Sequence, residues 1–181
     1  MHTLERLASS FGTDRYLVRG VDEADLADLL DVHRDDEVTR YLPYDTWHTM
    51  ADAQAWLMRV RGLEENGRSR QFVVVDRADR RVMGAVVLFN ADAVSARAEL
   101  GYVLGKRDWG RGVMREVLTA TIDRAFADLA LRRLEAFADA DNLASARLLQ
   151  RLGFVHEGTL REREWSKGSA RSVAVYGLLR A

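Results

Sequence analysis

The spacing of apolar and polar residues along this chain predicts both helices and strands. After Gly112, apolar residues recur every three or four positions, which is the spacing of one face of an α-helix. The members of this stripe are Met114, Leu118, Ile122, Ala125, Phe126 and Leu129. The pattern predicts a long helix that begins just after Gly112.

Capping residues and closing glycines predict three more helices. The predicted helices cover residues 23–33, 50–66 and 142–152. Asp22 is a suitable N-cap for the first, and Thr49 with Asp52 forms a capping pair for the second. A glycine directly follows the second and the third, as is common at helix ends.

Short apolar stretches rich in β-branched and aromatic residues predict the strands. They cover residues 16–19, 71–75, 82–89, 97–104, 134–138, 154–159 and 173–179. The first half of this order suits antiparallel pairing, and the second half suits a strand–helix–strand crossover. We therefore predict an α/β fold, a mixed sheet of about seven strands with helices on both faces. The 181 residues are expected to form one domain, residues 1–181, in which residues 1–13 are a short helix or a loose arm.

The composition limits the kinds of partner. Hydrophobic residues make up 48% of the chain and charged residues 30%, as in soluble globular proteins, and the net charge is −1. A near-neutral chain has no overall field that attracts nucleic acid or anionic lipid. We therefore expect no nucleic-acid partner and no membrane partner, and either a monomer or a homodimer.

The chain contains no cysteine, which excludes disulfides, thiolate metal ligands and a cysteine nucleophile. The four histidines lack the spacing of metal ligands, so no metal is expected. No stretch approaches 18 consecutive apolar residues, and the first residues lack the apolar centre of a signal peptide. These features lead us to expect a cytoplasmic protein.

Residues 34–48 are expected to be irregular, because Pro43 prevents a continuous helix. The aromatic residues of this loop are Tyr41, Tyr44 and Trp47. They either line a wall that faces the substrate or form a hydrophobic staple between neighbouring helices. The acidic residues of the same loop are Asp35, Asp36, Glu37 and Asp45. These either attract a cationic acceptor or are simply solvated.

Positive charges gather around the start of the predicted long helix, although that end of a helix is already positive. The residues are Lys106, Arg107, Arg111 and Arg115. Asp108 and Glu116 offset only two of these four charges. Gly110 and Gly112 allow positive φ and a close approach of the backbone to a ligand. The combination favours a site for phosphate or pyrophosphate; the alternative is a glycine turn with solvated arginines.

This stretch matches neither of the common nucleotide-binding motifs. It lacks G-x-x-x-x-G-K-[ST], and the chain has no G-x-G-x-x-G after its first strand. Residues 107–112, with the sequence RDWGRG, do match R/Q-x-x-G-x-G/A. This motif resembles the acetyl-CoA pyrophosphate loop of the GCN5-related N-acetyltransferases (GNAT).

Further stretches resemble the RimJ/RimL-type branch of this superfamily, in the order in which the branch has them. They are residues 99–104, 109–116, 125–129, 131–134, 142–154, 157–161 and 176–179. Together these stretches span most of residues 15–180.

The resemblance implies a splayed sheet, with acetyl-CoA between the strands 97–104 and 134–138 and a bulge in the former. Main-chain groups of Tyr102, Val103 and Leu104 would contact the pantetheine arm. The residues of the implied pyrophosphate site are Arg107, Trp109, Gly110, Arg111, Gly112, Val113 and Met114. Asn142 would contact the pantetheine or orient the thioester, although a plain helix cap explains it equally well, and Ser145 would lie near the sulfur.

The same resemblance implies direct transfer of acetyl from the thioester to an amine, without a covalent intermediate. Glu99 is the candidate base, and the alternative is a carboxylate paired with Arg97. The Val103 N–H is the candidate oxyanion donor. Many members of the family carry a tyrosine where this chain has Leu149, so the leaving thiolate would depend on Ser145, on water or on no dedicated acid.

We therefore predict an N-acetyltransferase with acetyl-CoA as cosubstrate and a primary amine as acceptor. The acceptor is a protein N-terminal serine or alanine, or alternatively a small amine, an amino acid or an antibiotic. A function of another class is a non-catalytic acyl-CoA-binding or sensing module, which the missing tyrosine motivates.

Overall fold

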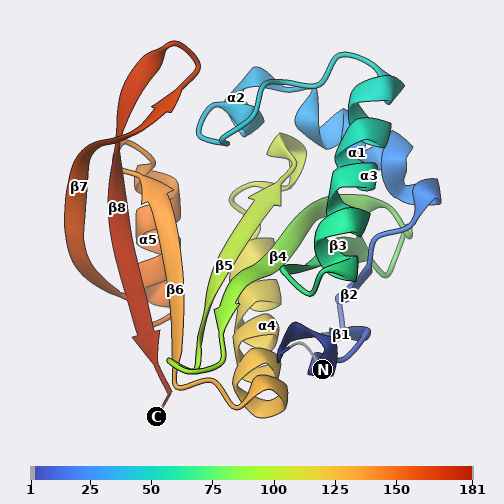
Figure 1. Cartoon of the computed structure of the whole chain (residues 1–181). Coiled ribbons are helices and arrows are strands. Elements are labelled where there is room, and N and C mark those ends of the chain that lie inside the picture. The colour runs from blue at the N-terminus through green and yellow to red at the C-terminus, as the bar shows by residue number, and fades with distance from the viewer. Residues whose placement is uncertain (1–2, 181) are drawn as a thin grey trace.

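The computed structural model describes residues 3–180, and these residues contain one sheet of eight strands. The spatial order is β1-β2-β3-β4-β5-β6-β8-β7, and only the β5–β6 pair is parallel among the described strands (Figure 1). The strands are β1 (Ser10–Gly12), β2 (Tyr16–Gly20), β3 (Ser69–Asp76), β4 (Val82–Asp92), β5 (Arg97–Leu104), β6 (Arg133–Asp139), β7 (Val155–Ser166) and β8 (Ser169–Leu179).

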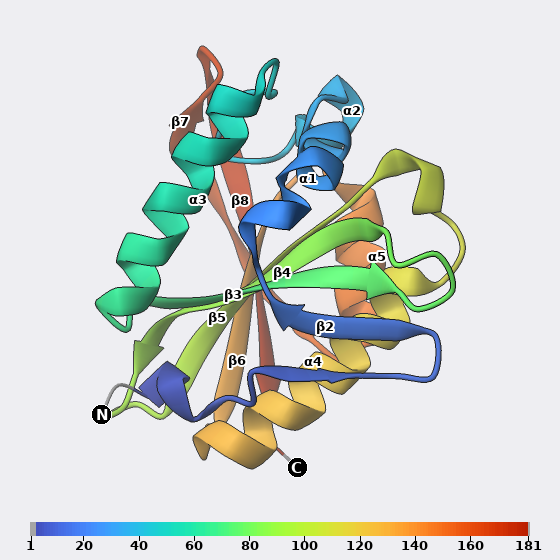
Figure 2. The same ribbon diagram turned by 90° about the vertical axis from the view of Figure 1, so that its right-hand side faces the viewer.

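Helices cover both faces of the sheet, which confirms the predicted fold class (Figures 1 and 2). The helices are α1 (Leu26–His33), α2 (Asp36–Thr39), α3 (Met50–Glu65), α4 (Val113–Leu129) and α5 (Leu143–Arg151). Apolar side chains of α1 and α3 share a buried cluster with Val73 and Val75 of β3. Those of α4 and α5 share the other cluster with Phe72 and Val74, whose side chains alternate with the first pair. The core therefore has two parts, one on each face of the sheet.

The N-terminal segment is attached to the sheet. A 3-10 turn (Thr3–Arg6) is followed by β1, which pairs antiparallel with β2. Leu4 and Leu7 are buried against the rest of the core. β1 was not predicted from the sequence, because its three residues are too few to show a period.

The predicted helix caps are present. Thr49 and Asp52 form a capping box at α3, and the Asn142 side chain accepts the Ser145 N–H of α5 at 3.0 Å. The expectation that residues 34–48 are irregular was wrong for four residues, because Asp35 accepts the Glu37 N–H at 2.9 Å and starts α2.

β5 and β6 separate along their length. They pair only where residues 97–99 lie opposite residues 133–135. Beyond this point β5 stays with β4, up to Leu104 opposite Gly84, while β6 stays with β8, up to Asp139 opposite Val173. We call this region, residues 101–104 of β5 and 136–139 of β6, the β5–β6 split (Figure 1). One edge of each strand is left without a strand partner there.

The bulge expected in strand 97–104 is not present, so that prediction was wrong. The register between β4 and β5 is regular from Gly84 opposite Leu104 to Phe89 opposite Glu99. The irregularity lies between Phe89 and Asp92, next to the turn into β5. Continuous antiparallel pairing with β4 keeps β5 regular, and the split arises because β6 turns away.

Gly84 is expected to be needed for the close approach of β4 to β5. A Cβ there would overlap the Val103 carbonyl oxygen and lie 3.0 Å from Leu104 Cα, and both are main-chain atoms that cannot rotate away. We expect Gly84→Ala to lower the free energy of unfolding by about 1–3 kcal/mol, measured by urea denaturation. The matched control is Gly62→Ala in α3, where a Cβ meets nothing within 4 Å; it should raise stability by about 0.5–1 kcal/mol. Equal stability of the two variants would contradict this prediction.

Candidate active site

The free edge of β5 presents main-chain groups to the split. The Gly105 N–H donates to the Met83 carbonyl of β4 at 2.8 Å, and main-chain groups alternate between the two sides of an antiparallel strand. Tyr102 and Leu104 therefore direct their N–H and C=O groups away from β4, into the split. The Trp109 indole agrees with this direction, because its Nε1 donates to the Leu104 carbonyl at 2.8 Å. The N–H groups of Tyr102 and Leu104 and the Tyr102 carbonyl are thus turned toward a ligand in the split.

Val103 has the opposite orientation. By the same alternation its N–H points to β4, and its side chain packs against the cluster beneath α1 and α3. The sequence analysis assigned the oxyanion donor to the Val103 N–H on the strength of a bulge, and without a bulge this group is committed to the sheet.

The loop between β5 and α4 is built around the buried carboxylate of Asp108, which is 0% exposed. Arg81, in the turn between β3 and β4, donates to both oxygens of this carboxylate at 3.0 Å, and Arg111 donates to one of them at 3.1 Å. Arg107 lies 3.9 Å from the same carboxylate. We call these four residues the Asp108 cluster. Sequence reasoning missed Arg81, since nothing in the local pattern connects it to a loop 27 residues away.

The other charges of this region have separate partners. Lys106 pairs with Glu37 at 2.5 Å, and Glu116 pairs with Arg15 and Thr13 of the β1–β2 turn. Glu116 therefore does not offset the charges of the arginines in the loop, although the sequence led us to expect that it would.

The loop geometry suits an anion. Gly110 has φ +72° and Gly112 has φ +76°, and a Cβ at either would meet nothing within 4 Å. The backbone there is open to a ligand, and α4 begins directly afterwards at Val113. Free N–H groups of the first helical turn, the positive end of α4 and the exposed guanidinium groups of Arg107 and Arg111 all favour phosphate. The described residues thus fit the pyrophosphate of coenzyme A.

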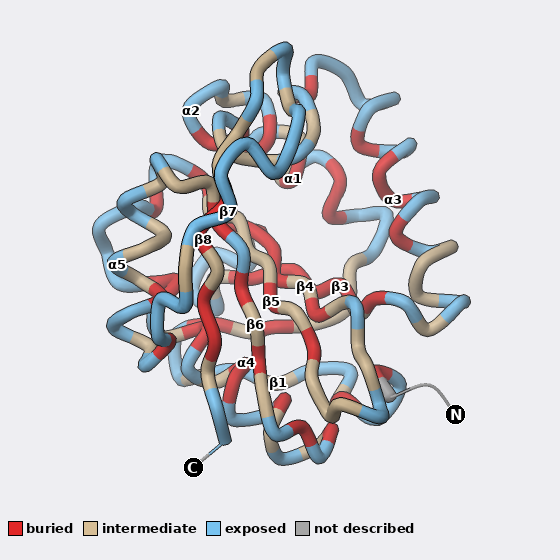
Figure 3. Tube along the Cα trace, turned by 60° about the vertical axis from the view of Figure 1, so that its left-hand side comes forward, coloured by how far each residue is buried: buried red, intermediate tan, exposed pale blue. Residues whose placement is uncertain are grey.

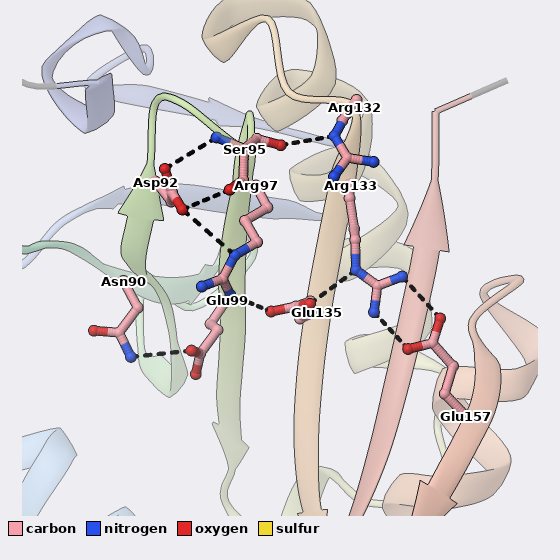
Figure 4. A network of polar contacts seen from close by, with 9 residues as sticks. All are labelled: Asn90, Asp92, Ser95, Arg97, Glu99, Arg132, Arg133, Glu135 and Glu157. Atoms are coloured by element: carbon pink, nitrogen blue, oxygen red, sulfur yellow. Dashed lines mark hydrogen bonds and ion pairs between the residues drawn. The ribbon is translucent and has the colours of Figure 1, made fainter.

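Glu99 lies where the pairing of β5 with β6 ends (Figure 4). Its carboxylate accepts a hydrogen bond from Asn90 Nδ2 at 3.1 Å. The suggested partner Arg97 instead contacts Glu135 at 2.6 Å and Asp92 at 3.8 Å. Within residues 3–180, no arginine or lysine forms an ion pair with Glu99.

The neighbouring carboxylates are neutralised by arginines (Figure 4). Glu135 is partly desolvated, but hydrogen bonds from Arg133 and Arg97 outweigh this and lower its pKa. Arg133 also holds Glu157 through two hydrogen bonds, at 2.8 and 2.5 Å. Glu99 is therefore the carboxylate of this network that remains available to accept a proton.

Asn90 was not identified from the sequence. It has φ +48° and lies in the irregular part of β4, between Phe89 and Asp92. In a regular strand its side chain would point to the face opposite Phe89 and Glu99. The left-handed conformation, which asparagine tolerates better than most residues, turns it toward Glu99.

A pair of hydroxyl groups bridges β5 and α5 beside the split. Tyr102 Oη lies 2.7 Å from Ser145 Oγ. Burial raises the pKa of the Tyr102 hydroxyl to about 12, although the hydrogen bond to Ser145 opposes this rise. Leu149, at the position of the family's tyrosine, is 1% exposed and packs in the core. From the sequence, only the main chain of Tyr102 was expected to belong to the site, and the contact of its side chain with Ser145 was not predicted.

The aromatic residues of the loop 34–48 divide into two groups. Trp47 is buried and stacks on His33, and the Tyr44 hydroxyl lies 3.1 Å from His33 Nε2. Burial lowers the pKa of His33 to about 4, so the ring is neutral; its Nδ1–H donates to the Leu29 carbonyl and its Nε2 accepts from Tyr44. These two aromatics form the hydrophobic staple. Only Tyr41, among the three, extends toward α5, where its hydroxyl donates to the Asp141 carbonyl at 3.3 Å.

A polar cavity of about 410 Å³ lies between this loop and the turn of the β7–β8 hairpin. Its lining residues are Asp36, Arg40, Asp45, Thr46, His48, Lys167 and Arg171. Lys167 connects the hairpin to the loop by donating to the Thr39 carbonyl at 2.6 Å. Figure 3 shows that this end of the hairpin is largely exposed. It contains three cationic and two acidic side chains, so the acidic cluster predicted from the sequence does not act alone.

Two features of other protein classes are absent from residues 3–180. No group of three His, Asp or Glu side chains is arranged to hold a metal ion. No helix there combines the length and the hydropathy that a membrane span requires.

Comparisons with known proteins agree with this geometry. A family model described as an acetyltransferase (GNAT) domain matches residues 15–155. The uncharacterized N-acetyltransferase p20 of Bacillus licheniformis is 31% identical over 168 residues, which are 93% of this chain and 94% of that protein.

Two solved structures share the fold. One is RimL, a ribosomal L7/L12 α-N-protein acetyltransferase in complex with coenzyme A, with a TM-score of 0.81 and 18% identity over 92% of this chain and 95% of that chain. The other is spermidine N-acetyltransferase from Vibrio cholerae in complex with CoA and spermine, with a TM-score of 0.79 and 22% identity over 92% and 96%.

Proposed function

Because the chain belongs to the GNAT acetyltransferase family, it is an N-acetyltransferase, and we propose that it transfers acetyl directly from acetyl-CoA to a primary amine. The observation that carries the proposal is the position of Glu99. Its carboxylate, which has no arginine or lysine partner in residues 3–180, lies where β5 and β6 separate, next to the free β5 edge and on the strand that leads to the anion-binding loop. A base, a main-chain edge for an extended ligand and a phosphate site thus follow one another along one segment of the chain.

In this proposal the Asp108 loop and the start of α4 hold the pyrophosphate of acetyl-CoA. The C=O group of Tyr102 and the N–H of Leu104 bind the pantetheine arm as an added strand would. The fold neighbour RimL was solved with coenzyme A, which supports CoA as the ligand class.

Glu99 removes a proton from the acceptor ammonium, directly or through a water molecule. The free amine then attacks the thioester carbonyl, and a tetrahedral oxyanion forms. The Tyr102 N–H replaces the Val103 N–H as the candidate oxyanion donor, because it faces the split and is the nearer of the two such groups to Glu99 along β5.

We further propose that the acceptor is the α-amine of a protein N-terminus. The names of the two fold neighbours divide between a ribosomal protein and spermidine, so the distinction must come from this chain. The polar cavity contains Arg40, Lys167 and Arg171, against two carboxylates. A polyamine carries only positive charge and would meet three cations beside the two carboxylates, whereas a peptide also has carbonyl and carboxylate groups that the cations can bind.

The test measures thiol release from acetyl-CoA with a panel of acceptors. The panel contains peptides with free Ser, Ala, Thr or Met N-termini, spermidine and spermine, free amino acids and aminoglycosides. We expect kcat/KM for the Ser and Ala peptides to exceed that for the polyamines by at least about tenfold, which is about 1.4 kcal/mol of differential binding. N-terminally blocked peptides of the same sequence serve as the matched control.

Each other outcome points to a specific alternative. Faster turnover of a polyamine or an aminoglycoside would overturn the acceptor and keep the enzyme class. CoA binding without thiol release to any amine would favour the sensing module.

A cytoplasmic location remains a prediction from the sequence.

A further inference from the structure

The hydroxyl groups of Tyr102 and Ser145 form a hydrogen bond that connects β5 to α5 beside the β5–β6 split. Tyr102 is on β5 and Ser145 is in the first turn of α5, 43 residues later, and their hydroxyl oxygens are 2.7 Å apart. The Tyr102 main chain faces the split, while its ring extends along the face that carries α4 and α5. The two hydroxyls therefore lie beside the place where we assign the thioester arm.

Either hydroxyl can donate in this pair, and the acidity of the two groups favours one direction. A phenol is a far stronger donor than an aliphatic hydroxyl, so Tyr102 Oη–H donates and Ser145 Oγ accepts. Ser145 has one hydrogen, and no other hydrogen bond to its Oγ occurs in residues 3–180. The Asn142 side chain fixes the Ser145 main chain at the same time, through the Ser145 N–H. With Tyr102 as the donor, the Ser145 hydrogen has no acceptor among residues 3–180.

We propose that Tyr102 is a positioning residue, which holds the Ser145 hydroxyl so that its hydrogen is donated to the thioester sulfur. The inference rests on the proposed function, because it requires the arm of acetyl-CoA to lie in the β5–β6 split. The Tyr102–Ser145 pair would take the role of the tyrosine that many family members carry where this chain has Leu149, with a hydroxyl from β5 acting through a serine of α5.

The step conserves protons without a dedicated acid. When the tetrahedral intermediate collapses, the C–S bond breaks and the sulfur leaves with the electron pair as a thiolate. The Ser145 O–H donates a hydrogen bond to this thiolate, and the sulfur later takes a proton from water. The nitrogen of the collapsing intermediate still carries one proton more than the amide product, and it releases this proton to water. Glu99 also returns the proton that it removed from the ammonium to solvent. Each turnover therefore releases two protons from the nitrogen, takes up one at the sulfur and leaves the enzyme unchanged.

Tyr102 itself does not give up its proton. Burial raises the pKa of its hydroxyl to about 12, whereas a thiol has a pKa of about 8.5. Transfer of the phenolic proton to the thiolate would be unfavourable by more than three pKa units. Stabilisation of the thiolate by a hydrogen bond is therefore the role that remains for this pair.

The test titrates the thiol of CoA bound to the protein, following the ultraviolet absorbance of the thiolate against pH. It requires no acceptor. We expect the wild-type protein to lower the pKa of the bound thiol below that of free CoA, and Tyr102→Phe to raise it again by about one unit, or tenfold in the thiolate-to-thiol ratio. Ser145→Ala should have at least the same effect, and the double variant should resemble Ser145→Ala.

Two controls separate this role from a structural one. Tyr16→Phe removes a hydroxyl from a buried tyrosine of β2, and it should leave the pKa of the bound thiol unchanged. The affinity for desulfo-CoA, which lacks the sulfur, should be the same in wild type and Tyr102→Phe. An unchanged thiol pKa in Tyr102→Phe, with CoA still bound, would overturn this inference and leave the proposed function intact. Failure of the wild-type protein to bind CoA would overturn both.

Discussion

Replacing Glu99 with glutamine is expected to lower kcat by about 10²–10⁴-fold while the affinity for CoA stays the same. Glutamine keeps the shape of the side chain and can still bond to Asn90, but it cannot accept the proton of the ammonium. The measurement is thiol release under saturating acetyl-CoA, with CoA affinity determined separately by calorimetry. Loss of activity with unchanged CoA binding would assign the effect to the chemical step.

The matched control is Glu157→Gln. This residue belongs to the same polar network but lies on β7, where Arg133 holds it. Its activity should remain within about twofold of wild type, because exposed ion pairs contribute little. Equal losses in the two variants would mean that the network is structural and that Glu99 is not the base.

The pH dependence of Glu99→Gln also identifies the acceptor. Without a base, only the fraction of amine that is already neutral reacts, so kcat/KM should rise with pH up to the pKa of the amine. An α-amine has a pKa of about 7.7–8.0 and a lysine-like amine about 10.4. A plateau near pH 8 would support a protein N-terminus, whereas a continued rise above pH 9 would exclude it.

The helices and most strands of this protein can be predicted from local patterns. Thr49 and Asp52 interact within one helical turn, and the stripe from Met114 to Leu129 has one clear period. Such features depend only on neighbours in the chain, so the sequence contains all the information that they require.

The orientation of the site residues depends on contacts between distant segments. Whether Val103 or Tyr102 faces the split is decided by the pairing of Gly105 with Met83, and a shift of one residue would reverse it. The pairs Asn90–Glu99 and Tyr102–Ser145 arise from an irregular strand and from the docking of α5. The sequence therefore predicts which segment of β5 is the candidate site, but it does not predict which main-chain N–H groups of that segment face the split.

The buried carboxylate of Asp108 provides the largest expected effect on stability. We expect Asp108→Ala to lower the free energy of unfolding by about 3–5 kcal/mol, because it leaves the largely buried Arg81 with only the exposed Asp79, 3.6 Å away, to balance its charge. A typical domain has only about 5–15 kcal/mol in total. The measurement is urea denaturation, with Asp31→Asn as the control; Asp31 pairs with Arg34 at the surface, and its loss should cost less than about 1 kcal/mol. Equal midpoints for the two variants would contradict the prediction.

A double variant separates the two roles of the Asp108 cluster. Arg81→Met with Asp108→Leu replaces the buried pair by apolar side chains of similar size, which is often neutral for stability. We expect it to recover most of the stability that Asp108→Ala loses. Its affinity for CoA should remain at least about tenfold below wild type, because Arg107 and Arg111 are then no longer held beside the start of α4. Recovery of CoA affinity together with stability would mean that Asp108 supports only the fold and that the arginines bind phosphate without its help.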